Sequence, residues 1–424
     1  MSNPQALARR LGTFDAVMIG LGSMIGAGVF AAFTPAAAAA GSGLLVGLVV
    51  AAVVAYCNAT SSAQLAAVYP TSGGTYVYGR ERLGPWAGFL AGWGFVIGKT
   101  ASAAAMAMTF AAYAAPAGWE RPVAIAAVVL LAAVNYHGVT RTAGLTRILV
   151  IGVIVALGIA VAACWGSATP APEKILGGGV LAHGWYGILQ SAGLLFFAFA
   201  GYVRIATMGE EVRNPKRTIP RAIGIALAIT VVLYAVIALT LLATIGSDGV
   251  AESPAPLATA VGGGTWAWAA PIVRAGAAVA ALGALLALIA GLGRTSLAMA
   301  REHDLPYWFS AVHPRYKVPH RAEAVLAVVI CAVIAVADLR GAIGFSSFGV
   351  LIYYLVANLS AFTQPTTDRR YPKALQVVGA LACMVLVATL PPLSVGLGVL
   401  MFAAGIILRL IRLHKHRPPS VQAP

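Results

Sequence analysis

Four glycines lie within Ile19–Phe30, IGLGSMIGAGVF, a stretch that is otherwise apolar enough to cross a membrane. Glycine costs roughly 1 kcal/mol relative to alanine inside a helix, so Gly20, Gly22, Gly26 and Gly28 together favour local unwinding. Unwound backbone at membrane depth needs hydrogen-bonding partners that lipid cannot supply, and a polar ligand can be such a partner. The stretch therefore predicts a broken helix whose backbone binds a ligand.

The same glycines have a second interpretation. Gly22 and Gly26 have the small-xxx-small spacing of a helix-packing face, and this interpretation stays open at this point. A dinucleotide-binding loop is disfavoured, because the spacing is GxGxxxG, no strand precedes it and the next acidic residue is Glu81.

The composition indicates a polytopic membrane protein, since 60% of the 424 residues are hydrophobic and only 10% are charged. The 28 basic residues outnumber the 13 acidic ones, but they occur in short clusters between long apolar runs, which favours topology signals over a nucleic-acid surface. The four cysteines lie in apolar segments and are expected to be buried thiols. The sequence contains no metal-ligand cluster, nucleophile motif or carboxylate pair, so we expect neither an enzyme nor a cofactor.

Twelve segments are long enough to span the hydrocarbon layer, which takes roughly 20 apolar residues. They lie near 14–38, 43–67, 86–114, 121–137, 142–165, 186–208, 220–245, 266–293, 322–338, 342–363, 373–390 and 393–410. The fourth and ninth segments are the shortest. The predicted fold is therefore all-α, with twelve transmembrane helices between an N-terminal segment, 1–13, and a C-terminal tail, 411–424.

Basic residues are distributed unevenly over the predicted loops. The even-numbered loops and both termini hold 22 of the 28, whereas the odd-numbered loops hold three, Arg121, Lys174 and Arg340. The positive-inside rule then places both termini in the cytoplasm and Asp248–Pro256 outside. This distribution predicts a multi-pass protein of the cell membrane.

The sixth segment contains a second irregular element, where Gly201 interrupts the aromatic-rich run of Leu195–Gly209. Interruptions in the first and sixth spans are what an inverted repeat of five spans would produce, here 14–165 and 186–363, followed by two more spans in 373–410. Free N–H groups and carbonyls at the broken helix ends suit a zwitterion. Ordinary packing of the FFAF aromatics is the alternative.

Longer motifs around these elements make the chain resemble the amino acid–polyamine–organocation (APC) permease superfamily. The matching stretches are GSMIGAGVF at 22–30, YPTSGGTYVYGRERLGPWAGFLAGW at 69–93, FFAFAGYVRIATMGEEVRNPKRTIPRAI at 196–223 and LGRTSLAMAREHDLPYWFSAVHPRYKVP at 292–319. The resemblance implies a five-plus-five inverted-repeat transporter for amino acids or related amines.

The resemblance also implies which residues bind the substrate. The carboxylate cradle and the carbonyls for the amino group would fall on Ser23, Met24, Ile25, Gly26, Ala27 and Gly28. The aromatic lid would be Phe197, and further carbonyls would come from Ala198, Phe199, Ala200 and Gly201.

Two departures from the family bear on substrate and coupling. Many relatives carry an acidic residue two positions after the sixth-span glycine, but this chain has Val203 and then Arg204, so cationic substrates lose a partner. The fifth span has no lysine, and Lys99 in the third span is the deeply placed charge. A lysine at the bilayer centre is costly and by default functional, so Lys99 is a candidate for proton coupling. Neutral amino acids are the expected substrates.

Charged residues after the sixth span suggest an inner gate. Arg204, Glu210 and Glu211 are the candidate gating residues, and the two carboxylates could pair with Arg213, Arg217 or the basic residues at 80–82. An exchanger, a carrier of polyamines or cationic amino acids, and a sodium symporter remain alternatives, as do an amino acid sensor or channel of the same fold. The sequence does not indicate the substrate, the coupling ion or an accessory subunit.

Overall fold

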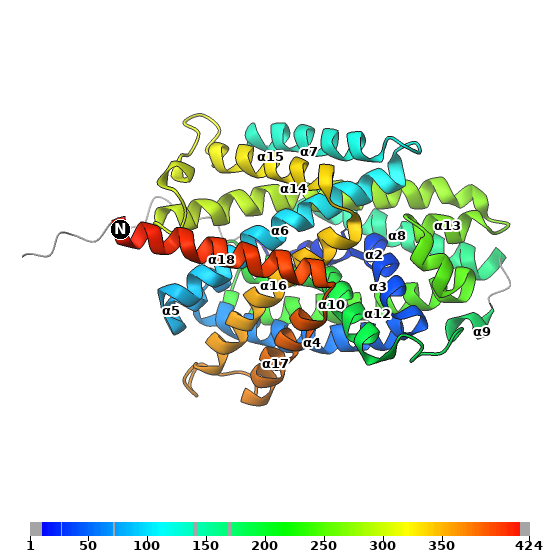
Figure 1. Cartoon of the computed structure of the whole chain (residues 1–424), viewed down its shortest axis with the longest axis horizontal. Coiled ribbons are helices and arrows are strands. Elements are labelled where there is room, and N and C mark those ends of the chain that lie inside the picture. The colour runs from blue at the N-terminus through cyan, green and yellow to red at the C-terminus, as the bar shows by residue number, and fades with distance from the viewer. Residues whose placement is uncertain (1–10, 27, 71–72, 139–142, 168–170, 416–424) are drawn as a thin grey trace, which may run out of the picture.

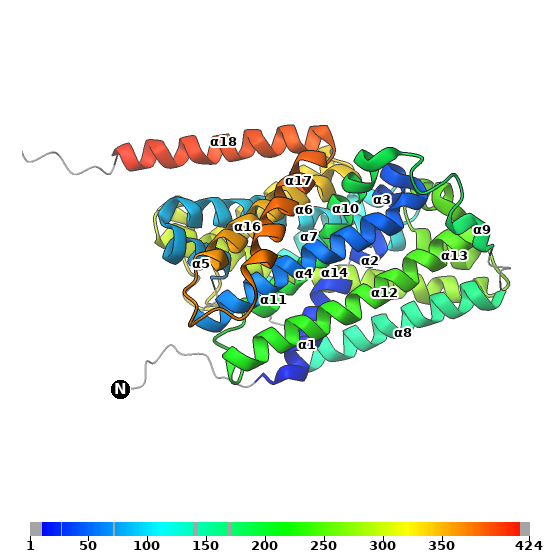
Figure 2. The same ribbon diagram turned by 90° about the horizontal axis from the view of Figure 1, so that it is seen from below.

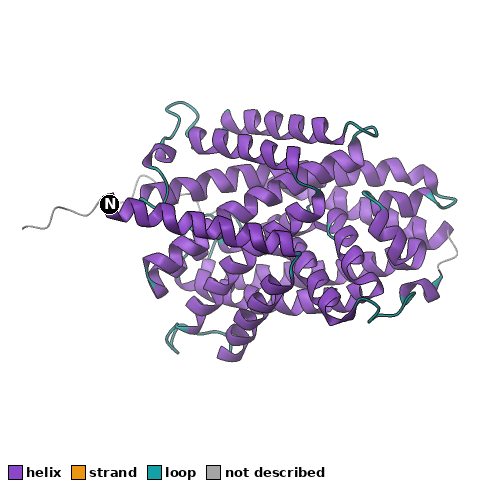
Figure 3. Cartoon of the chain, viewed as in Figure 1, coloured by secondary structure: helices purple, strands orange, loops and turns teal. Residues whose placement is uncertain are grey.

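The computed structural model describes residues 11–415 apart from 27, 71–72, 139–142 and 168–170, and most of them are helical (Figure 3). Within these residues the extended pairing is limited to an isolated bridge between Leu11 and Val212. The α-helices are α1 (Thr13–Ile25), α2 (Gly28–Ala31), α3 (Phe33–Ala40), α4 (Leu44–Val68), α5 (Thr75–Leu83), α6 (Pro85–Ala114), α7 (Glu120–Tyr136), α8 (Ala143–Ser167), α9 (Pro172–Ile175), α10 (Gly184–Phe199), α11 (Val203–Ala206), α12 (Pro215–Glu252), α13 (Pro256–Gly262), α14 (Ala270–Arg301), α15 (His320–Val336), α16 (Leu339–Phe362), α17 (Lys373–Thr389) and α18 (Pro392–Lys415). Short 3₁₀ helices are η1 (Gly41–Gly43), η2 (Ala200–Tyr202), η3 (Ala267–Ala269) and η4 (Tyr307–Ser310).

In the described part of the chain, nine helical stretches are long and apolar enough to cross a membrane. They are Thr13–Ala31, Phe33–Val68, Pro85–Ala114, Ala143–Gly166, Gly184–Ala206, Pro215–Glu252, Ala267–Arg301, Leu339–Phe362 and Pro392–His414. The three other predicted spans coincide with α7, α15 and α17, each 17 residues long. A 17-residue helix extends about 25 Å, somewhat less than a typical hydrocarbon layer. The difference between nine and twelve therefore depends on these three short helices.

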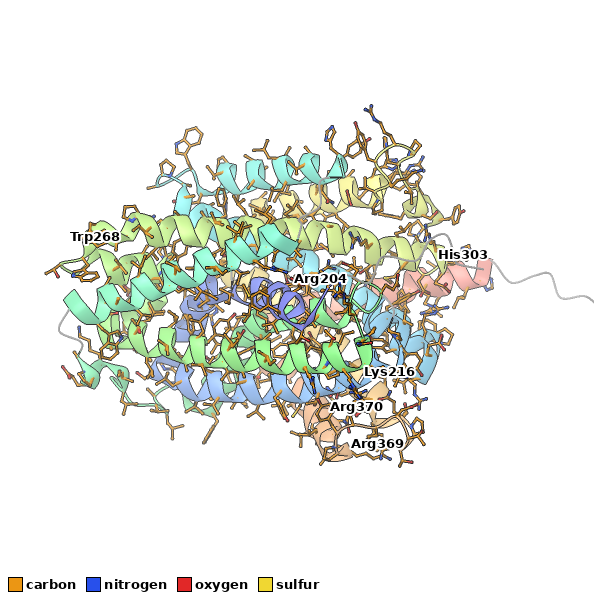
Figure 4. All side chains as sticks on the ribbon, turned by 180° about the vertical axis from the view of Figure 1, so that it is seen from behind. Arg204, Lys216, Trp268, His303, Arg369 and Arg370 are labelled. Atoms are coloured by element: carbon orange, nitrogen blue, oxygen red, sulfur yellow. The ribbon has the colours of Figure 1, made fainter. Side chains whose placement is uncertain are left out.

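The long helices run along the longest axis of the molecule, with α5 near one end and α9 near the other (Figure 1). Figure 4 places Lys216, Arg369 and Arg370 at the same end as α5, and Trp268 at the opposite end. We call the end that carries Lys216, Arg369 and Arg370 the basic end. Segments from different predicted even-numbered loops thus meet at one end of the helices.

Glycines let α6 pack closely against α16 in the core. A Cβ on Gly349 would lie 2.5 Å from the carbonyl oxygen of Gly94, and one on Gly98 would lie 3.0 Å from that of Ser346. Beside this crossing the hydroxyls of Ser102 and Ser346 are hydrogen-bonded at 2.6 Å. Small residues and buried hydroxyls are the usual means by which membrane helices associate, because apolar burial offers little between helices in lipid.

Candidate functional site

The first predicted span is broken between α1 and α2. Helix α1 ends at Ile25, Gly26 leaves the helical region with φ 17° and ψ −127°, and α2 begins at Gly28. Ala27, which the resemblance includes in the site, lies outside the described residues. The interruption predicted from the glycines is therefore present, and Gly26 is its pivot.

The two earlier glycines do not unwind the chain, and in this respect the expectation was wrong. Gly20 and Gly22 lie inside α1, where the absence of a Cβ makes room for other helices. A Cβ on Gly20 would overlap Ile205 of α11, and one on Gly22 would lie 2.9 Å from Val150 of α8. These two positions serve packing.

The sixth predicted span forms a tighter helical turn near the point where the first span unwinds. Helix α10 continues through Phe199 into η2, a single 3₁₀ turn, and then into α11. Gly201 lies in that turn, and a Cβ there would overlap the carbonyl of Ser23 and lie 2.6 Å from the amide nitrogen of Met24. Gly201 therefore permits the close approach of two backbones, and the helix is not unwound at this residue.

A second close contact joins the other sides of the two interruptions. A Cβ on Gly28 would lie 2.8 Å from both the Cα and the Cβ of Ala198. Ser23, Met24 and Gly28 of the first span thus lie against Ala198 and Gly201 of the sixth. The structure brings together the two stretches that the sequence singled out, although the contacting residues are 170 or more positions apart.

Tyr234 of α12 links the two interruptions. Its hydroxyl lies 2.6 Å from the carbonyl oxygen of Met24 and 3.1 Å from that of Ala198, so the two carbonyls share its single proton. Its ring packs against Phe199, with 5.0 Å between the ring centroids. Tyr234 could not be singled out from the sequence, because a single tyrosine in an apolar span shows no pattern. Figure 2 shows the neighbouring position of α12 and α1.

The Tyr234 hydroxyl thus donates to the carbonyls of Met24 and Ala198. The resemblance assigns carbonyls at these positions to the amino group of a substrate. A small cavity beside the break has about 20 Å³ of accessible space, close to that of one water molecule. It is lined by Gly22, Ile25, Gly26, Leu149, Val150, Val153, Val279 and Ala280. An amino acid does not fit this cavity, which α8 and α14 line opposite the break and to which the sixth span contributes no lining residue. We call the arrangement in which Tyr234 donates to the carbonyls at the two interruptions the closed arrangement. Phe197, the expected lid, is buried.

Lys99 is buried in α6, with 6% of its surface exposed. The four ion pairs found among the described residues do not include it. An ammonium group without a carboxylate at this depth is costly, which agrees with the reason for singling it out. Its role stays a prediction.

The charges at the basic end are paired differently from the expected inner gate. Arg80 forms ion pairs with Glu302 at 2.9 Å and with Asp304 at 3.0 Å, both from the segment after α14. Arg80 thus has acidic partners other than Glu210 and Glu211, and the gating role of Arg204, Glu210 and Glu211 stays a prediction. Arg204 of α11 lies inward from the basic end (Figure 4), within electrostatic range of Glu211.

Asp304 is the centre of a buried cluster that the sequence did not reveal. Its carboxylate accepts hydrogen bonds from the Tyr76 hydroxyl at 2.8 Å and from Arg80 at 3.0 Å, and it forms an ion pair with Arg409 of α18 at 3.1 Å. Burial raises the pKa of Asp304 above its ordinary value, while Tyr76 and the two arginines act in the opposite direction. The last helix is thereby anchored to the basic end through a cluster with a substantial desolvation cost.

The chain just before α1 is also tied to the segment after α11. The Leu11 amide donates to the Glu211 carbonyl at 3.1 Å, and the Arg213 amide donates to the Leu11 carbonyl at 2.9 Å. A displacement of either interrupted element would therefore be transmitted to the other at the basic end.

Comparison with known proteins identifies the family. A family profile described as amino acid permease matches residues 11–411, nearly the whole chain. This chain belongs to the amino acid permease family. The resemblance to the APC superfamily, stated from the motifs, is thus confirmed.

Individual relatives of this permease differ in what they are named for. An uncharacterised transporter of Mycobacterium tuberculosis is 58% identical over 403 residues, which cover 95% of this chain and 91% of the relative. A branched-chain amino acid permease of Bacillus subtilis is 24% identical, covering 98% and 95%. The chloroplastic cationic amino acid transporter 6 of Arabidopsis thaliana is 27% identical, covering 84% and 66%. These relatives agree on transport and differ in the substrate named.

Proposed function

We propose that this permease is a secondary transporter that carries amino acids across the cell membrane by alternating access. The observation that carries the proposal is the junction at Tyr234, where carbonyls from both interrupted spans accept from one hydroxyl. Carbonyls released at a helix break are natural acceptors for an ammonium group, and the amides at the start of a half-helix suit a carboxylate. Such a junction can bind the shared part of every amino acid.

The residues assigned to the substrate are those that the resemblance implied. The substrate carboxylate would be bound between Ser23 and Gly28, and its ammonium group would replace the Tyr234 hydroxyl at the carbonyls of Met24 and Ala198. Phe197 would cover the occupied site, with Phe199, Ala200 and Gly201 completing its wall. Because Tyr234 already satisfies these carbonyls, the closed site need not contain unpaired acceptors.

The proposed topology has twelve spans and both termini in the cytoplasm. The spans form two inverted repeats, 14–165 and 186–363, followed by 373–410, and the three 17-residue helices count as spans. Support comes from the uneven distribution of basic residues and from the position of Lys216, Arg369 and Arg370 at one end of the helices. The basic end would then face the cytoplasm.

Neutral amino acids are the proposed substrates, with protons as the coupling ion. The sixth span presents Arg204 rather than a carboxylate, and Lys99 is a buried cation without an ion-pair partner in the described part of the chain. Both charges would repel a cationic side chain. The relative named for branched-chain amino acids fits this proposal better than the one named for cationic amino acids.

Counterflow in proteoliposomes tests the function. Vesicles containing purified protein and an unlabelled amino acid should accumulate the same labelled amino acid transiently above equilibrium, since a carrier exchanges one molecule for another. Leucine, alanine, arginine and putrescine should be compared, and protein-free vesicles serve as the control. A channel would only equilibrate the label and a sensor would not move it, so either behaviour would contradict the proposal.

A further inference from the structure

Residues 302–319 connect α14 to α15 and form a surface at the basic end. Figure 4 places His303, near the start of this segment, at that end. The short helix η4 within the segment exposes two aromatic side chains, with 70% of the surface of Tyr307 and 51% of that of Trp308 accessible. Exposed tyrosine and tryptophan side chains are typical of the interface between a membrane and water, where their rings lie among the lipid headgroups.

A cluster of aromatic rings holds this segment against the ends of α7 and α15, which lie side by side at one edge of the molecule (Figure 1). The ring centroid of Tyr136 in α7 lies 5.3 Å from that of His313 and 6.0 Å from that of Tyr316. His313 lies 5.4 Å from His320, the first residue of α15. Because α7 and α15 are only 17 residues long, their ends lie close to the edge of the hydrocarbon layer. The cluster is thus at the depth of the headgroups.

Three cations accompany these rings. Arg315 and Lys317 are exposed, and the guanidinium of Arg315 lies 5.5 Å from the ring centroid of Tyr316. Arg321, in the first turn of α15, has its guanidinium 5.1 Å from the ring centroid of Trp308. The ion pairs found in the described part of the chain include none of the three cations.

The carboxylates of residues 302–323 have other surroundings. Glu302 and Asp304 form ion pairs with Arg80. Glu323 is buried beside Gly293 of α14, where a Cβ would lie 2.8 Å from the Glu323 Cγ. The surface therefore combines exposed aromatic rings with positive charge that the carboxylates of its own segment do not pair with.

We propose that this surface binds the headgroup of an anionic phospholipid. The lipid phosphate would lie among Arg315, Lys317 and Arg321, whose guanidinium and ammonium groups donate to phosphate oxygens. The rings of Tyr307 and Trp308 would lie against the adjoining glycerol and acyl-chain region. A lipid fits better than free phosphate, because the exposed rings need an apolar neighbour that free phosphate does not provide. The site is separate from the one proposed for the transported solute.

Thermal melting of the purified protein in detergent mixed with lipid tests the proposal. Dioleoyl phosphatidylglycerol should raise the melting temperature by several degrees more than dioleoyl phosphatidylcholine, which has the same acyl chains and no net charge. A variant that combines Arg315→Gln, Lys317→Asn and Arg321→Gln should lose most of this difference. Asparagine is chosen at position 317 because it tolerates the φ of 57° there. The measurement requires no transport, so its failure is distinct from a failure of the proposed function.

The matched control removes three exposed cations from the segment that leads into α12, with Arg213→Gln, Lys216→Gln and Arg217→Gln, and should keep the full difference. An equal loss in this control would overturn the site, since the lipid would then respond to the overall charge of the basic end. Equal effects of the two lipids on the wild type would also overturn it. Inorganic phosphate should leave the melting temperature unchanged, and a rise as large as that with phosphatidylglycerol would reject a lipid as the ligand. If the combined variant does not fold, Lys317→Asn alone should lose part of the difference, and a full difference would reject the site.

Discussion

The Asp304 cluster predicts a large and specific loss of stability when its charge is removed. Asp304→Asn keeps the shape of the side chain but takes away the negative charge that Arg409 and Arg80 share. The side chain of Arg409 is only 7% exposed, whereas that of Arg80 is 25% exposed and still has Glu302 as a partner. Most of the loss should therefore come from Arg409.

The expected magnitude follows from the remaining partners of Arg409. Removing one partner from a buried ion pair costs about 3–5 kcal/mol. Arg409 would keep its hydrogen bond to the Pro85 carbonyl at 2.9 Å and its contacts with the faces of Trp86 and Phe89, each at 4.6 Å. Such cation–π contacts offset about 1 kcal/mol, so we expect a net destabilisation of about 2–4 kcal/mol.

A double-mutant cycle separates this effect from general damage. Because both charges of the pair are removed from water, the ion pair provides little net stability, and Asp304→Asn combined with Arg409→Met should recover most of the loss. Melting in detergent can be followed with a thiol-reactive dye, since Cys57, Cys164 and Cys383 are buried until the protein unfolds. Arg301→Gln, an exposed residue of the same segment, is the control. Additive losses in the double variant would refute the reasoning.

Three further predictions concern the site and the topology. Tyr234→Phe leaves two buried carbonyls without their donor at a cost of about 1–3 kcal/mol, so it should destabilise the closed state and slow counterflow; an unchanged rate would show that the hydroxyl has no part in closure. Arg217→Cys and Asp248→Cys, each in a cysteine-free background, should be labelled from opposite sides of the membrane, and labelling from one side would reject the twelve-span topology. Lys99→Met should retain some substrate binding and accept cationic amino acids better, as measured by competition in counterflow; unchanged selectivity would mean that Lys99 is structural.

The break in the first span could be predicted from the sequence because its cause is local. Four glycines in an apolar run weaken a helix wherever the run lies. Which glycine becomes the break depends on the folded chain, because Ile205 and Val150 pack where Gly20 and Gly22 have no Cβ, and the helix opens at Gly26 instead. A span can likewise be predicted wherever the apolar run is long, because that signal is also local to the sequence. It is least certain at the three 17-residue helices, whose length is marginal for the hydrocarbon layer.

Contacts between residues far apart in the sequence could not be predicted. Tyr234 meets Met24 across 210 positions and Asp304 meets Arg80 across 224, and no periodicity links the partners. Asp304 lies in a loop and Glu323 in the first turn of α15, where solvent usually covers carboxylates, yet both are buried. Their burial depends on glycine, tyrosine and arginine residues from other helices, which only the folded chain brings together.

Ligand-induced stabilisation of Gly26→Leu tests the central claim, that the break at Gly26 binds the substrate. A ligand at 100 times its Kd stabilises the folded state by about 2.7 kcal/mol, so the melting temperature of the wild type should rise clearly with its substrate. A side chain at Gly26 would start 3.0 Å from the Cβ of Ala284 and fill the space beside the break, whereas Gly158 of α8 has open space around it. We expect Gly26→Leu to fold but to show no shift, and Gly158→Leu to shift like the wild type. A folded Gly26→Leu variant with the full wild-type shift would contradict the claim.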